Sequence, residues 1–158
     1  MTPRAPARGG APSTGGGATA ASTLELIERS RASLLEACHS RAIAERYLQS
    51  RLAAMRAAAA LVSARAATAG VPGPHSLWAL LPSVAPELTE WAEFFEATGL
   101  RHDPRGTALG GGGATAVTAR EADDLLRQAE TFVDLVCRSL GLPASPPHGN
   151  VLVPTAWA

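Results

Sequence analysis

Apolar residues in the segment 117–140 recur at steps of three and four, and mostly polar or charged residues fill the positions between them. This spacing is typical of a helix with one buried face. Thr118 and Glu121 have the spacing of a capping box at the start, and Gly141 followed by Pro143 is a stop signal at the end. The pattern predicts a core helix with a solvent-exposed back. Its expected inward positions are Ala122, Leu125, Ala129, Phe132, Val133, Val136 and Leu140.

Two further helices are predicted before it. Ser22 and Glu25 open a helix that runs through about Ala37, and Ser40 is the expected cap of a longer helix to about Ala69. The inward residues of the first helix are expected to be Leu24, Ile27, Leu34 and Cys38. In the second helix, apolar residues alternate steps of four and three, which predicts a seam that packs lengthwise against other helices. This seam consists of Leu48, Leu52, Met55, Ala59, Val62 and Ala66.

Prolines divide the next helical region. Pro82 and Pro86 interrupt the chain after Trp78, and Pro86 suits the first turn of a helix that runs to about Thr98. The expected inward residues of this helix are Leu88, Trp91, Ala92 and Phe95, and the expected solvent-facing acids are Glu87, Glu90, Glu93 and Glu96. Phe94 falls between the two faces, so it is expected at the edge of the buried surface.

These elements predict an all-α fold of four to five helices in one domain. Residues 1–21 are rich in Gly, Ala, Pro, Ser and Thr without periodicity and are expected to be disordered. The helical domain spans 22–141, with a mobile Gly-rich loop at 99–116, and a Pro-rich tail follows at 142–158.

Composition bounds the function classes. The formal net charge is zero, so no overall field draws the protein onto nucleic acid or an anionic membrane. No apolar run reaches the length that spans a bilayer, and the N-terminus lacks the apolar stretch of a secretory signal. The chain is therefore expected in the cytoplasm, without a membrane partner.

Local charges are expected to form structural pairs. Arg51 and Arg56 lie beside the seam of the second helix and are expected to meet carboxylates of neighbouring helices. On the last helix, Arg120, Arg127 and Arg138 share one side, and each has an acid four residues away: Asp124, Asp123 and Asp134 respectively. An ion-paired solvent face is the simplest interpretation of this arrangement.

Motifs for catalysis and cofactor binding are lacking. Cys38 and Cys137 form no Cys-x-x-Cys pair and are expected to be buried reduced thiols, and their spacing with His39 and His148 matches no zinc pattern. The glycines at 110–113 are not a phosphate loop, since no Lys-Ser or Lys-Thr follows them. We therefore predict no catalytic residue, no metal and no cofactor.

Three stretches together resemble the HEPN superfamily, and specifically the SAV_6107-like HEPN domain family of actinobacteria. They are RYLQSRLAAMRAAAALVSARA, LWALLPSVAPELTEWAEFF and VTAREADDLLRQAETFV, and they cover most of residues 40–140. The second and third stretches are the specific part. The resemblance implies an up-and-down helical bundle that commonly dimerises. Many members of the superfamily are ribonucleases or the toxin halves of toxin-antitoxin pairs, and others only bind nucleic acid or proteins.

Catalytic HEPN members carry an Arg and a His separated by four to six residues near the start of the last core helix. Arg120 matches the Arg, but the positions for His hold Leu125, Leu126 and Arg127. Without an imidazole, metal-independent RNA cleavage lacks its acid or base. The resemblance therefore favours a non-catalytic binding module, and the rival hypothesis is a ribonuclease with a displaced group such as His102.

Two pairs of residues are the candidate sites of this module. Arg120 and Arg127 are the candidates for nucleic-acid contact, if the partner is RNA rather than a protein. Phe94 and Leu135 lie off the inward stripes of their helices and are the candidates for a homodimer interface, because large apolar groups in such positions suggest an interaction surface.

Overall fold

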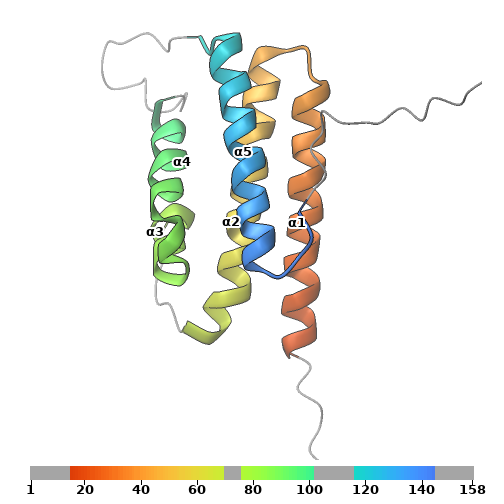
Figure 1. Cartoon of the computed structure of the whole chain (residues 1–158), viewed down its shortest axis with the longest axis vertical. Coiled ribbons are helices and arrows are strands. Elements are labelled where there is room, and N and C mark those ends of the chain that lie inside the picture. Colours follow the sequence, from red (N-terminus) through yellow and green to blue (C-terminus); the bar gives the residue numbers. More distant parts are fainter. Residues whose placement is uncertain (1–14, 70–75, 102–115, 145–158) are drawn as a thin grey trace, which may run out of the picture.

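The computed structural model describes residues 15–69, 76–101 and 116–144, and over these ranges the chain is helical without strands. The elements are α1 (Gly15–His39), α2 (Ile43–Ala69), α3 (Leu77–Val84), the 3-10 helix η1 (Pro86–Leu88), α4 (Thr89–Arg101) and α5 (Ala119–Ser139). The chain runs up α1, down α2, up α4 and down α5 (Figure 1). The predicted all-α, up-and-down bundle is confirmed.

Helix α2 is at the centre of the bundle, where it packs against α1, α5 and α3. The shorter unit of α3, η1 and α4 lies on the opposite side of α2 and α5 from α1 (Figure 1). Aromatic rings join this unit to α5: the ring centroid of Phe132 lies 5.2 Å from that of Phe95 and 5.7 Å from that of Trp91. Trp78 of α3 stacks on Phe95 at 5.3 Å. Such pairs add to the free energy of burial.

Helix α5 follows the sequence prediction closely. Thr118 accepts a hydrogen bond from the backbone N–H of Glu121, whose carboxylate accepts one from the backbone of Thr118, so the capping box is confirmed. Gly141 has a φ of 71°, and the N–H of Leu142 donates to the carbonyl of Cys137 over 2.8 Å. This is a Schellman ending, which glycine favours because its φ is positive. The buried residues are Ala122, Leu125, Ala129, Phe132, Val133, Val136 and Cys137.

The predicted seam of α2 is wrong in the first half of the helix. Leu48 and Met55 are 55% and 39% exposed, and Leu52 is only half-buried. The face that packs is instead built from fully buried alanines: Ala53, Ala54, Ala57, Ala58 and Ala60. Small side chains let helix backbones approach closely, so this face fits against α1 and α5 better than the larger residues do. Towards the end of α2 the seam does pack, since Val62 is 9% exposed and Ala66 contacts the core.

The starts of α1 and α2 also differ from the prediction. Helix α1 begins at Gly15, so residues 15–21 are helical rather than disordered, and Ser22 lies inside the helix instead of capping it. Extending a formed helix is easier than nucleating one, and the alanines at 18, 20 and 21 favour this extension although the glycines at 15–17 oppose it. Helix α2 begins at Ile43, and the Ser40 hydroxyl donates to the carbonyl of Ala42 instead of accepting from the first N–H groups of the helix. In α1, Ile27 and Leu34 are buried as predicted, whereas Cys38 is only half-buried and Leu24 is 50% exposed.

The 3-10 helix η1 and helix α4 together present the predicted inward face. Leu88, Ala92 and Phe95 are buried, Trp91 is half-buried, and the four glutamates opposite are exposed. The helix ends at Arg101, so Gly99 is helical rather than part of the predicted loop. Residues 102–115 of that loop, with His102, lie outside the described residues, as do residues 1–14, 70–75 and the tail from 145 onward. None of the described helices is long and apolar enough to cross a membrane.

Candidate functional site

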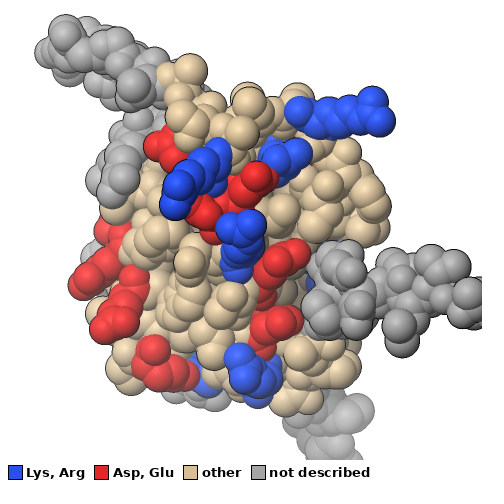
Figure 2. Space-filling view, turned by 45° about the horizontal axis from the view of Figure 1, so that its top comes forward, with Lys and Arg blue, Asp and Glu red and all other residues tan. Residues whose placement is uncertain are grey.

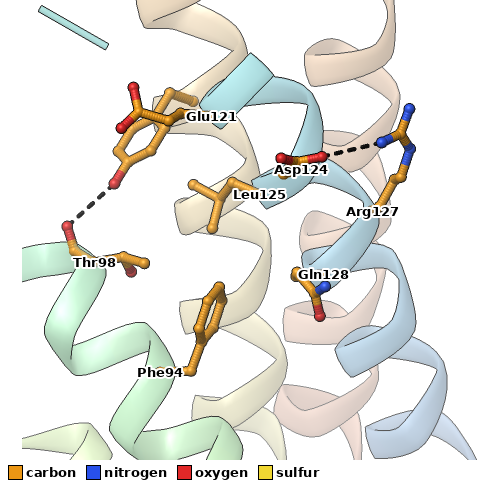
Figure 3. Close-up of a pocket in the computed structure, with 8 residues that line it drawn as sticks. Phe94, Thr98, Glu121, Asp124, Leu125, Arg127 and Gln128 are labelled. Atoms are coloured by element: carbon orange, nitrogen blue, oxygen red, sulfur yellow. Dashed lines mark hydrogen bonds and ion pairs between the residues drawn. The ribbon is translucent and has the colours of Figure 1, made fainter. Parts of the chain in front are cut away.

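A groove between α4 and the first half of α5 is lined by several of the sequence-predicted site residues (Figure 3). We call it the α4–α5 groove, and its volume is about 480 Å³. Its lining residues are Tyr47, Phe94, Thr98, Glu121, Asp124, Leu125, Arg127 and Gln128. The groove thus brings together Phe94 and Arg127, which the sequence analysis assigned to two different roles.

The α4 wall and the base of the groove are aromatic and apolar. Phe94 is 38% exposed and points from α4 towards α5, while Leu125 of α5 is buried opposite it (Figure 3). The ring of Phe94 packs edge-on against Phe95 with centroids 5.0 Å apart, so one side of it is held by the core. The Tyr47 hydroxyl donates to the carbonyl of Thr98 over 3.2 Å and ties α2 to α4. The Phe94 ring therefore packs on the core on one side and is open to the groove on the other.

The α5 wall carries charges that are already paired. Asp124 accepts from Arg127 over 3.1 Å, and its other oxygen lies 3.7 Å from the Nε of Arg120. The predicted pair of Arg127 with Asp123 is wrong, because Asp123 instead forms an ion pair with Arg46 of α2. Three residues along a helix bring side chains as close as four do, and Arg46 competes for Asp123 from the neighbouring helix. The single carboxylate of Asp124 therefore pairs with both Arg120 and Arg127, the two candidates for nucleic-acid contact.

Both arginines are nevertheless accessible. The side chains of Arg120 and Arg127 are 91% and 73% exposed. Exposed ion pairs contribute little free energy, so these guanidinium groups exchange partners easily. The charges that line the groove are nonetheless more acidic than basic, since Glu121 and Asp124 accompany Arg127. Figure 2 shows acidic and basic side chains intermixed over this end of the molecule, without a continuous basic surface in that view.

Other residue types occupy the positions that hold histidine in catalytic HEPN members. Leu125 is 3% exposed and Leu126 packs partly buried against the core. Arg127 is the third of these positions and is paired with Asp124. The only histidine among the described residues is His39, which lies at the end of α1 and lines a different hollow, with Leu35 and Ser40.

Leu135, the second predicted interface residue, does not line the groove. It is half-buried and packs against the core from the lower part of α5. It follows Gln128 by seven residues, which places it two turns further along the same side of the helix. Leu135 therefore continues the line of the α5 wall below the groove.

Arg138, also on α5, donates weakly from Nε to the backbone carbonyl of Asp134 rather than to its carboxylate.

The two cysteines are free thiols in separate surroundings. Cys137 is buried, and burial raises its pKa although the Arg31 guanidinium opposes the shift. Cys38 is half-buried, and burial raises its pKa, as does the neighbouring Glu130 carboxylate, which lies 3.7 Å away. Among the described residues, no group of three or more His, Cys, Asp or Glu is placed to hold a metal ion.

Part of the groove was not predicted from the sequence. Tyr47 and Thr98 are 51 residues apart in the chain, and only the packing of α2 against α4 joins them. No local signal points to that contact. Gln128, in contrast, follows Glu121 by seven residues on the same helix, so helical geometry alone would have placed it on this wall.

The family assignment agrees with this geometry. The family model of the SAV_6107-like HEPN domain matches residues 37–137, which include the whole of α2, α3, η1 and α4 and nearly all of α5. A search of curated proteins and a search of solved structures each gave no match. Since the model matches well over half of the chain, this protein belongs to the SAV_6107-like HEPN family.

Proposed function

We propose that this chain is a non-catalytic HEPN module that pairs with a second copy through the α4–α5 groove and binds a protein partner. The observation that carries the non-catalytic role is that the positions of the catalytic histidine hold leucine and arginine. Leu125 forms part of the groove base, and Arg127 forms an exposed ion pair with Asp124. A buried leucine cannot transfer a proton to or from a ribose hydroxyl, so the acid or base of the HEPN ribonucleases has no counterpart there.

Pairing would use the open face of Phe94. A half-exposed aromatic ring beside a hollow is the kind of anchor that a complementary surface covers. In a two-fold dimer the same surface meets itself, so Phe94 would reach the apolar floor of the partner's groove. Leu135 would extend the contact along α5. Arg127 and Glu121 lie on the same wall, so two such walls offer both signs of charge to each other.

A protein is favoured over RNA because of charge. RNA binding is dominated by Lys and Arg contacts to phosphates, and these are most effective on a continuous basic surface. The groove lining has two carboxylates and one guanidinium. The outer face of η1 and α4 adds four exposed glutamates. Arg120 and Arg127 would therefore act in pairing with carboxylates rather than in phosphate contact.

Incubation with RNA tests the non-catalytic role. Purified protein should leave single-stranded and hairpin RNA uncut without metal, and a fluorescently labelled RNA should show only weak binding that disappears at about 0.2 M salt. Cleavage that is lost in Arg120→Ala would establish an active ribonuclease. Cleavage lost in His102→Ala would establish the rival hypothesis of a displaced catalytic group. Tight RNA binding that is lost in Arg120→Ala or Arg127→Ala would show that the partner is RNA and not a protein.

A further inference from the structure

Helix α2 carries a row of apolar side chains on its outer surface. We call Leu48, Leu52 and Met55 the α2 row. Leu48 is 55% exposed, Met55 is 39% exposed and Leu52 is half-buried. They follow one another at steps of four and three, so they lie along one line of the helix. The buried alanines occupy the opposite and lateral faces of α2, which pack against α1, α5 and α3 (Figure 1).

Arginines flank this row on both sides. Arg51 lies one turn after Leu48 and one turn before Met55, and Arg56 lies one turn after Leu52. Within the described residues, neither guanidinium forms an ion pair with a carboxylate. The sequence-based expectation that both would meet carboxylates is therefore wrong for the described part of the chain.

Each arginine instead lies against a neighbouring helix. Arg56 donates to the Ser33 hydroxyl over 2.6 Å and to the carbonyl of Arg29 over 3.0 Å, both on α1. Arg51 lies over Gly99 of α4, where an added Cβ would come 2.7 Å from its guanidinium nitrogen. Arg56 is thus held on α1 by hydrogen bonds, and among the described residues no carboxylate pairs with either guanidinium. The acid at this end of α2, Glu45, accepts from Gln49 over 2.8 Å.

We infer that the α2 row docks an amphipathic helix of a partner protein whose apolar side chains are flanked by Asp or Glu. Alternating steps of four and three are the spacing with which one helix packs lengthwise on another. Arg binds carboxylates through two parallel hydrogen bonds, and no carboxylate of the described residues occupies Arg51 or Arg56. This inference rests on the proposed role in protein binding, but its surface is separate from the α4–α5 groove.

Other occupants fit the row less well. A second copy would bring its own Arg51 and Arg56 against these two, and like charges in contact oppose association. The chain's own segments 1–14 and 145–158 contain no Asp or Glu side chain that could pair with the guanidinium groups. An acidic helix satisfies both the apolar row and the charges beside it.

A pair of synthetic peptides tests the inference on the full chain. Both are designed helices of about three heptads with leucine at the seam positions, one with Glu and one with Lys at the flanking positions. Fluorescence anisotropy should show binding of the Glu peptide and about tenfold weaker binding of the Lys peptide, because two ion pairs are replaced by two repulsions. Equal affinity for the two peptides would overturn the inference.

Variants locate the binding to the row. The double variant Leu48→Glu/Met55→Glu should no longer bind the Glu peptide. Arg51→Glu should bind the Glu peptide more weakly and the Lys peptide more tightly than the parent does. Leu35→Glu is the matched control, because Leu35 is an apolar residue of α1 that is 47% exposed and lies outside the row. Unchanged binding by the double variant, or displacement of the peptide by RNA, would contradict the inference.

The same variants separate this inference from the proposed function. The double variant should keep the oligomeric state of the parent protein. If it turned a dimer into a monomer, the row would be the self-association surface and the inference would fail. If the parent were monomeric but bound the Glu peptide as described, the groove-mediated pairing would fail and the acidic-helix site would stand.

Discussion

Ser30 of α1 donates a hydrogen bond to the carbonyl of Ala53 on α2 over 2.8 Å, and both residues are fully buried. A side chain as short as serine reaches the neighbouring backbone only where two helices lie very close. This closeness depends on the alanines of α2. It also explains why the larger apolar residues of α2 are left on its outer surface.

Enlarging this contact should destabilise the bundle. Ala53→Leu is expected to lower the free energy of unfolding by about 1–3 kcal/mol, because extra methylenes must be forced into a packed interface. Urea unfolding followed by circular dichroism measures the change. Ala59→Leu is the control, because Ala59 is only half-buried, and it should change the value by less than about 0.5 kcal/mol. Equal effects at the two positions would show that the alanine face is not closely packed.

Removing the N-terminal cap of α5 should lower the free energy of unfolding by less than Ala53→Leu does. Thr118→Ala is expected to lower the free energy of unfolding by about 1 kcal/mol, since the N–H of Glu121 loses its acceptor. Thr131→Ala on the same helix is the matched control. Thr131 is exposed and inside α5, where alanine is the better helix former, so this variant should be as stable as the parent or slightly more stable. The prediction fails if Thr118→Ala also leaves urea unfolding unchanged.

The thiols should be protected by folding. Burial raises the pKa of both Cys137 and Cys38, so the thiolate that reacts with iodoacetamide is scarce in the folded state. Mass spectrometry at pH 8 should find Cys137 unmodified until the protein unfolds and Cys38 modified slowly. Similar labelling rates in folded and unfolded protein would contradict this.

The same pKa shifts predict how stability changes with pH. The folded state binds the thiol protons more tightly than the unfolded state does. This contribution to stability is therefore complete below the unfolded thiol pKa, about 8.5, and is lost as the pH rises through the raised values. Urea midpoints measured at rising alkaline pH should fall, and Cys137→Ser should fall less steeply than the parent.

The sequence predicted some elements better than others for physical reasons. In α5 the cap, the stop signal and the apolar stripe are all local, and all three are confirmed. In α2 the prediction followed side-chain size and placed Leu48 and Met55 inside. Burial there depends instead on how closely two helices can approach, which is a property of the pair. The groove residue Tyr47 was missed for the same reason, because its contact with α4 forms only in the folded bundle.

Sedimentation velocity of the parent and of Phe94→Glu at micromolar concentration tests the central claim most directly. The parent should sediment as a dimer. Phe94→Glu should sediment as a monomer with unchanged helicity, because the ring is 38% exposed and its replacement leaves the core intact. Leu35→Glu, which changes an exposed apolar residue away from the groove, should remain dimeric. A monomeric parent, or a Phe94→Glu variant that still dimerises, would contradict pairing through the α4–α5 groove.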